Sequence, residues 1–219
     1  MTDLSGARFV VWGSAGHALV LQGLLKMSGA SIVVVVDNDP AAVPVVHGVP
    51  LVHGQGGLED FLRTESQRPL HGAVAIGGGR GHARRDILTL LGALGLAAPT
   101  LVHPKSAVCD TAQIGPGSQI LANATVAAAV SIAHACIVNH GAIVDHECRL
   151  GAGTHVAPGA TLCGCVTVGE NVFIGAGAVV LPRLRLGAGC VVGAGAVVTS
   201  DVREGAVVVG NPARPLSGR

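Results

Sequence analysis

Aromatic residues are almost missing from this chain: it has no tyrosine, three phenylalanines and one tryptophan. A core built on aromatic clusters is therefore excluded, and the 49% hydrophobic share must act through small and aliphatic side chains. Charged residues are also few, at 12%, and the net charge is +1. This balance gives no electrostatic reason to bind nucleic acid or a membrane surface.

The chain also lacks the long apolar runs that mark membrane proteins. No uncharged apolar stretch of about 18 residues reads as a membrane helix. The N-terminus has no basic region followed by an apolar run, which a secretory signal would show. We therefore expect a cytoplasmic protein without a membrane span, whose six cysteines are thiols rather than disulfides.

Glycine is abundant, with 33 residues, and the second half of the chain carries a repeat with a period of six. Every sixth residue from Val102 to Val198 is Ile, Leu or Val, and the residue two positions earlier is usually small. Such a period fits neither a helix nor an alternating strand. It predicts a parallel β-helix in which each hexad makes one face and three hexads close a triangular coil.

Three cysteines, Cys136, Cys148 and Cys190, occupy the small inward position of the repeat, so we interpret them as core filler. The "CGC" segment at Cys163 and Cys165 could suggest a metal site. No second ligand pair with zinc spacing accompanies it, so no metal is expected.

The first half predicts a small α/β unit. Its elements in order are a strand at 9–13, a helix at 14–29, and strands at 31–37 and 72–79, followed by a helix at 80–95. This order implies a parallel sheet with right-handed crossovers. We place the domain boundary near residue 100, with a Rossmann-like domain over 1–100 and the β-helix over 101–219.

A glycine-rich turn between the first strand and helix offers main-chain amides to a phosphate. Its residues are Gly13, Ser14, Ala15, Gly16 and His17. Asp37 ends the next strand, at a distance from Gly13 that resembles a dinucleotide fingerprint, but only two of the three glycines of that fingerprint are present. A nucleotide-sugar diphosphate makes the same demands on the turn as NAD. A tight turn without any ligand is the alternative.

Together the two halves resemble the hexapeptide-repeat sugar O/N-acyltransferases. This family includes the bacillosamine- and perosamine-type nucleotide-amino-sugar N-acetyltransferases and related sialic acid O-acetyltransferases. The matching segments are "VWGSAGHA", "AIGGGRGHARR" and "VNHGAIVDHECRLGAGTHVAPG". The resemblance implies a left-handed parallel β-helix behind the α/β domain. The "GGGRGH" segment replaces a more polar loop of relatives, which leaves the contacts to base and sugar open.

The resemblance also implies site residues. His146 would be the general base and Glu147 its supporting acid. Further positions would contact the substrates: His155, Gly164, Ala176 and Ala194 toward acetyl-CoA, and Asn139 toward the acceptor sugar. The chemistry is coherent, because an imidazole titrates near neutrality and a thioester needs no enzyme nucleophile. A main-chain N–H would stabilise the thioester oxygen.

His140 is the closest rival of His146. His134, His140 and His146 recur at every sixth position, so they lie on different faces of one coil, and no metal site formed by all three is expected within one chain. The flat, weakly charged faces of the prism should pack together, and the family resemblance implies a homotrimer with active sites between neighbouring prisms.

The expected function is transfer of acetyl from acetyl-CoA to the amino group of a nucleotide-linked deoxy-amino-sugar. One alternative is O-acetylation of sialic acid or another sugar hydroxyl. A second alternative is a non-catalytic β-helix, either a carbonic-anhydrase-like metal protein or an assembly scaffold.

Overall fold

The computed structural model describes residues 3–67 and 69–216. The chain divides into two compact units: Met1–Gly77 with Asp86–Pro99, and Gly78–Arg85 with Thr100–Arg219. The short segment Gly78–Arg85 lies in the first half of the sequence but belongs to the second unit. Among the described residues, no helix is both long and apolar enough to cross a membrane.

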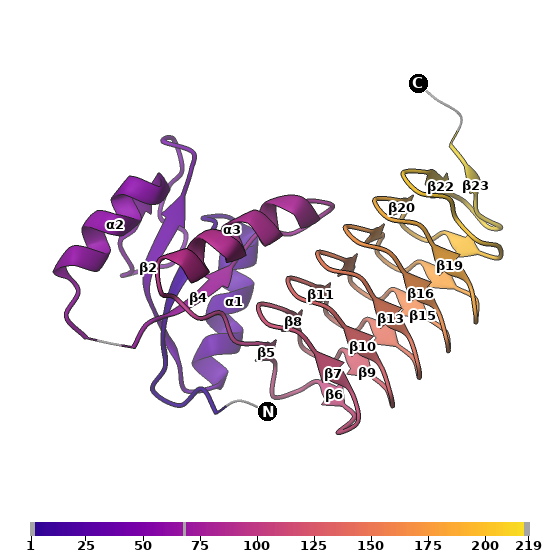
Figure 1. Ribbon diagram of the computed structural model, residues 1–219, viewed down its shortest axis with the longest axis horizontal. Coiled ribbons are helices and arrows are strands. Elements are labelled where there is room, and N and C mark those ends of the chain that lie inside the picture. Colours follow the sequence, from indigo (N-terminus) through magenta and orange to yellow (C-terminus); the bar gives the residue numbers. More distant parts are fainter. Residues whose placement is uncertain (1–2, 68, 217–219) are drawn as a thin grey trace. The chain divides into compact units, whose positions relative to one another are not determined.

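The first unit is built on a four-stranded parallel sheet with the order β3-β2-β1-β4 (Figure 1). Its strands are β1 (Arg8–Trp12), β2 (Ser31–Asp37), β3 (Leu51–His53) and β4 (His71–Val74). The helices are α1 (Gly16–Met27), α2 (Gly54–Thr64) and α3 (Gly81–Ala93), whose first residues count with the second unit. Apolar side chains from β1, β2 and β4 form the buried core.

Among the described residues of the first unit, the helix α2 and the strand β3 were not predicted by the sequence pattern. Helix α2 begins with Gly54, Gln55, Gly56 and Gly57, which are mostly poor helix formers. Only Leu58 of this helix is buried. Its sequence therefore carries little of the apolar periodicity that reveals a helix.

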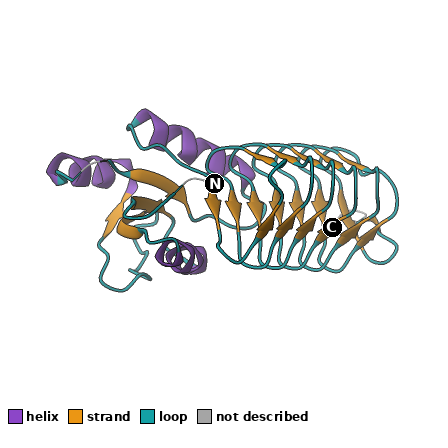
Figure 2. Cartoon of the chain, turned by 90° about the horizontal axis from the view of Figure 1, so that it is seen from below, coloured by secondary structure: helices purple, strands orange, loops and turns teal. Residues whose placement is uncertain are grey.

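The second unit is a left-handed parallel β-helix with three faces (Figures 1 and 2). The first sheet holds β5 (Leu101–Val102), β8 (Gln119–Ile120), β11 (Ile137–Val138), β14 (His155–Val156), β17 (Phe173–Ile174), β20 (Val191–Val192), β22 (Val207–Val209) and the antiparallel β23 (Arg214–Pro215). The second holds β6 (Ala107–Val108), β9 (Thr125–Val126), β12 (Ile143–Val144), β15 (Thr161–Leu162), β18 (Val179–Val180) and β21 (Val197–Val198). The third holds β7 (Gln113–Ile114), β10 (Ser131–Ile132), β13 (Arg149–Leu150), β16 (Thr167–Val168) and β19 (Arg185–Leu186).

The predicted hexad core is confirmed. The aliphatic residue of every hexad from Ile120 to Val198 is buried. Residues one coil apart pair in register, as Val138 does with Ile120 and Val156. The aliphatic side chains of successive coils thus stack along the axis in columns. Parallel pairing supplies the main-chain hydrogen bonds, while the columns supply the apolar burial.

The corners of the prism share one backbone conformation. The third residue after each aliphatic position has a positive φ in every hexad from Gly117 to Gly195. Half of these residues are glycine, which adopts this conformation freely. Glu147 (φ 59°) and Cys165 (φ 64°) do so against a steric cost of roughly 1–2 kcal/mol per residue. Neighbouring coils thereby hold Glu147 and Cys165 in equivalent positions.

The cysteine interpretation leads to a first prediction. Cys136, Cys148 and Cys190 are buried, and burial raises the pKa of each thiol to about 11. At pH 8 only about one part in a thousand of each is therefore the reactive thiolate. Iodoacetamide labelling read by mass spectrometry should modify the partly exposed Cys109, Cys163 and Cys165 and spare the buried three.

Denatured protein, in which all six thiols should react, is the control for this labelling. Modification of the buried thiols in native protein, at the rate of the exposed ones, would contradict their place in the core.

Candidate active site at the His146 corner

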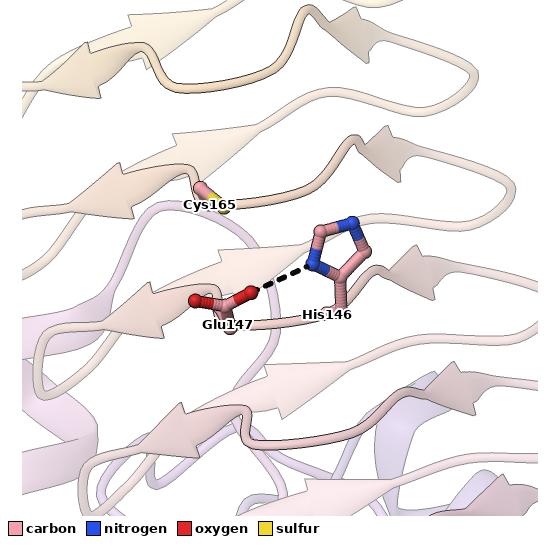
Figure 3. Close-up of side chains that lie close together, drawn as sticks. All are labelled: His146, Glu147 and Cys165. Atoms are coloured by element: carbon pink, nitrogen blue, oxygen red, sulfur yellow. Dashed lines mark hydrogen bonds and ion pairs between the residues drawn. The ribbon is translucent and has the colours of Figure 1, made fainter.

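His146 stands at the corner between β12 and β13. Its main-chain N–H donates to Asp145 Oδ1 at 2.7 Å, which fixes the start of the turn. Its ring Nδ1 lies 3.2 Å from Glu147 Oε1, as Figure 3 shows. Because Nδ1–H donates to this carboxylate, the lone pair of the neutral ring is on Nε2. The His146 side chain is 51% exposed, and its Nε2 lies 4.0 Å from Asp145 Oδ2.

Gly164 makes room for the His146 ring. It lies one coil after His146, and a Cβ on it would overlap Nε2 and lie 2.6 Å from Cε1 of that ring. Its φ is not in the left-handed region. The equivalent corner position in the other hexads from 116 to 200 is Ala, Pro, His, Glu or Ser, so the backbone there accepts a side chain. The glycine is required by the imidazole and not by the turn.

Replacing Gly164 with alanine should therefore displace the imidazole and lower kcat by about 100-fold, since a shift of about 1 Å in a catalytic group has that effect. The matched control is the same change in a His146→Ala background. There the clash is gone, and Gly164→Ala should stabilise the fold by about 0.4–1 kcal/mol in denaturant unfolding. Full activity of the single variant, or equal destabilisation in both backgrounds, would contradict this role.

Asn139 and His155 form a pair inside the protein. His155 is 4% exposed, and its Nδ1 lies 3.1 Å from the Gly78 carbonyl. Since Nδ1–H donates to that carbonyl, Nε2 accepts the amide of Asn139 at 3.0 Å. Asn139 Oδ1 in turn accepts the N–H of His140 at 2.8 Å. The structure thus places both residues in an ordered network, and their contacts with acetyl-CoA and sugar stay predictions.

The buried Arg84 anchors this network. It lies in the "AIGGGRGHARR" segment, but the sequence predicted no role of its own for it. Its guanidinium donates to the main-chain carbonyls of Ala135 at 3.0 Å, Gly78 at 3.1 Å and Gly153 at 2.5 Å. Burial lowers the pKa of Arg84 to about 10, so it remains charged near neutrality. The Gly78 carbonyl accepts from both Arg84 and His155, so Arg84 helps to hold in place the acceptor that His155 Nδ1 contacts.

The main-chain positions predicted to line the acetyl-CoA track fall in two corner stacks. Gly164 lies in the stack of His146, where the N–H of Cys165 donates to the His146 carbonyl at 2.9 Å. Ala176 and Ala194 lie in the stack that contains His140, and their coils are joined by the bond from Gly195 N–H to Ala176 O at 2.8 Å. The second sheet, from β6 to β21, runs between these two stacks.

In the first unit, the predicted turn follows β1, the strand that lies between β2 and β4. Gly13 has φ 116°, and a Cβ on it would lie 2.6 Å from the Ala75 carbonyl oxygen. The N–H of Ser14 donates to Asp37 Oδ2 at 2.6 Å, while Asp37 Oδ1 accepts the N–H of Asp39. Asp37 therefore braces the turn, a role that the spacing alone did not reveal.

The helix that leaves this turn has a polar N-terminus open to solvent. Within the described part of the chain, no side-chain hydrogen bond caps α1 at Ala15, and both Ala15 and Gly16 are exposed. Helix N-termini without a side-chain cap can bind anions through their main-chain amides. The turn also lies at the carboxyl end of β1, which is the end of the strands where open α/β sheets bind ligands.

Comparison with known proteins agrees with the observed fold. Residues 165–200 match the bacterial transferase hexapeptide family (six repeats). The acetyltransferase domain of PglB from Neisseria gonorrhoeae, in complex with acetyl coenzyme A, is 35% identical, with a TM-score of 0.84 over 97% of this chain and 100% of that chain. PerB from Caulobacter crescentus, in complex with CoA and GDP-perosamine, is 35% identical, with a TM-score of 0.87 over 96% and 98%.

This chain belongs to the hexapeptide-repeat nucleotide-amino-sugar N-acetyltransferases. WeeI from Acinetobacter baumannii is 26% identical, with a TM-score of 0.81 over 96% of this chain and 100% of that chain. Structures of the Caulobacter GDP-perosamine enzyme with one histidine replaced by alanine or asparagine also contain CoA and GDP-perosamine. The search of curated proteins gave no match. Family and fold class are thus confirmed as the sequence predicted.

Proposed function

We propose that this protein transfers the acetyl group of acetyl-CoA to the amino group of a nucleotide-linked deoxy-amino-sugar, with His146 as general base. The observation that carries the proposal is the bond from His146 Nδ1 to Glu147 Oε1, which leaves Nε2 as the proton acceptor at an exposed corner. Membership of the family supports the substrate class. Two solved relatives, at 35% identity each, contain acetyl-CoA, or CoA with GDP-perosamine.

The reaction is a direct attack. The neutral amine of the sugar adds to the thioester carbonyl, and the oxyanion that forms accepts a main-chain N–H. His146 Nε2 takes the proton that the amine loses, while Glu147 stabilises the resulting imidazolium. Collapse of the tetrahedral intermediate breaks the carbon–sulfur bond, and the imidazolium returns the proton to the CoA thiolate. No acyl-enzyme is needed, because the thioester is already activated.

The nucleotide diphosphate is proposed to bind at the turn of Gly13, Ser14, Ala15, Gly16 and His17. The uncapped start of α1 supports this, because its dipole favours a negative charge. Asp37 shapes the turn by holding the Ser14 amide. We keep Asn139 as the proposed contact to the acceptor sugar and His155 as the proposed contact to acetyl-CoA.

We also propose a homotrimer. The corner stacks of His146 and of Ala176 and Ala194 border opposite edges of the second sheet, so one chain cannot bring both to one site. A neighbouring prism can place its Ala176–Ala194 corner opposite the His146 corner. Sedimentation velocity should give a trimer mass, and a monomer that persists at all concentrations would contradict the arrangement.

The activity is tested by offering UDP-, GDP- and dTDP-linked amino-sugars with acetyl-CoA and following the release of free thiol. Mass spectrometry should show an acetylated sugar nucleotide that resists mild hydroxylamine, as an amide does. A product that hydroxylamine deacetylates would be an ester and would favour O-acetylation. Absence of turnover with every amine, combined with turnover of a sugar hydroxyl, would overturn the proposal.

A second test concerns the nucleotide turn. Gly16 has open space where a Cβ would lie, so Gly16→Val should fold but cover the amides of the turn. We expect the KM for the sugar nucleotide to rise at least tenfold, about 1.4 kcal/mol of binding, and the KM for acetyl-CoA to stay unchanged. Gly23→Val, in the same helix and equally open, is the matched control. Equal damage to both substrates would contradict the assignment.

A further inference from the structure

The stacking of the coils places Cys165 next to His146 and Glu147, at the same corner of the following coil. Cys165 lies one coil after Glu147 and occupies the equivalent left-handed corner position. The close-up in Figure 3 shows its sulfur and the Glu147 carboxylate on adjacent coils, with the His146 ring beside them. One ligand atom from each of His146, Glu147 and Cys165 lies within 4.8 Å of the others.

These three side chains supply nitrogen, oxygen and sulfur, the donor set that Zn²⁺ takes in proteins. Tetrahedral coordination needs ligand atoms roughly 3–4 Å apart at ordinary Zn–ligand lengths. His146 Nδ1 and Glu147 Oε1 are already 3.2 Å apart. The side chains of His146 and Glu147 are half or more exposed, so small rotations can bring the atoms onto one ion, with water in the fourth position.

We propose that His146, Glu147 and Cys165 form an inhibitory Zn²⁺ site that competes with acetyl transfer. The ion takes the imidazole lone pair if it binds Nε2. If it binds Nδ1, the neutral ring must carry its proton on Nε2. In both cases His146 no longer accepts a proton from the amine. Cys165 releases its thiol proton to solvent on binding, because thiolate is the zinc ligand.

Known zinc-binding sequence motifs do not reveal this site, and the reason is physical. Zinc motifs place the members of a ligand pair only a few positions apart on one turn or helix. Here a full coil of the prism separates His146 and Glu147 from Cys165 in the sequence. Only parallel stacking, shown by the pairing of β12 with β15, makes these residues neighbours.

Metal binding is tested first without any assay of activity, since the inhibition rests on the proposed function but the site does not. Co²⁺ added to metal-free protein should give the intense d–d bands of tetrahedral coordination and a thiolate-to-cobalt charge-transfer band, both removed by added Zn²⁺. Cys165→Ser should lose the charge-transfer band and weaken Zn²⁺ binding by at least about 100-fold in calorimetry, since even outer-shell changes cost about 10–100-fold.

Cys163→Ser is the matched control, because Cys163 is partly exposed like Cys165 but outside the cluster. It should bind Co²⁺ and Zn²⁺ like the wild type. Co²⁺ spectra that are unchanged by Cys165→Ser, or absent in the wild type, would overturn the site.

Inhibition is tested with product formation read by mass spectrometry. Zn²⁺ should reduce wild-type and Cys163→Ser turnover, and EDTA should restore it. Cys165→Ser should keep wild-type turnover in metal-free buffer and lose at least about 100-fold in sensitivity to Zn²⁺. Spectroscopic binding with undiminished turnover would overturn the inhibitory role and also the assignment of His146 as the base.

Discussion

Replacing His146 with asparagine is expected to lower kcat by about 10²–10⁴-fold, the usual effect of losing a general base. Asparagine keeps a polar side chain of similar reach, and its Nδ2 can still donate to Glu147, but it cannot take a proton near neutral pH. The fold and the affinity for acetyl-CoA should persist, because the His146 side chain is half exposed and outside the buried columns. Steady-state kinetics with saturating acetyl-CoA measures the change.

His140→Asn is the matched control, one hexad earlier and at a different corner. The decrease in kcat should be much smaller for His140→Asn. The bond from His140 to Asn139 is made by the main-chain N–H, which the substitution leaves in place. A nearly normal His146→Asn enzyme together with a dead His140→Asn enzyme would place the base one hexad earlier. If both variants were active, the histidines would be structural, and the amine would lose its proton to solvent.

The second large effect is expected for stability. Arg84→Met removes the donors to the main-chain carbonyls of Gly78, Ala135 and Gly153. Hydrogen bonds to a charged group contribute about 1.5–3 kcal/mol, and buried acceptors left without donors cost about as much. We expect the free energy of unfolding to fall by about 3 kcal/mol, which lowers the Tm by roughly 6–12 °C in a chain of this size.

Arg85→Met is the control for this variant. The neighbouring Arg85 pairs with Glu170 at 2.7 Å, but the partners' side chains are 29% and 55% exposed. Exposed pairs contribute about 0–1 kcal/mol, so its Tm should hardly change. Similar shifts for the two variants would show that the Arg84 carbonyl contacts contribute little.

The six-residue pattern is sufficient to predict the β-helix, because each hexad shows its own inward-facing aliphatic residue. All of these residues from Ile120 to Val198 are buried. For Gly164 the family resemblance implies a contact with acetyl-CoA, but the sequence also contains a signal for its contact with His146. It is the glycine at a corner position that elsewhere bears a side chain, and its neighbour across the coil is the His146 ring. A glycine at such a position, one coil after a histidine, predicts that contact.

Other features depend on contacts that no local pattern encodes. In "RGHARR" the sequence shows three arginines, and nothing in it separates Arg84 from Arg80 and Arg85. The distinction arises from carbonyls at Ala135 and Gly153, which lie far along the chain in the coils of the β-helix. Likewise, the brace from Asp37 to Ser14 requires knowing how β2 ends beside the turn.

The uniform pairing of the coils has a consequence for how the β-helix opens. Each strand from β6 to β18 pairs with the strands one coil before or after it, so the pairing carries no very distant contacts. Such an array behaves as a row of units, each held by its neighbours, and its ends open before its middle. The strand before His146, β12, has β9 and β6 on one side and β15, β18 and β21 on the other. Amide hydrogen exchange should therefore be slowest in the coils that flank His146 and faster toward β21 and β22.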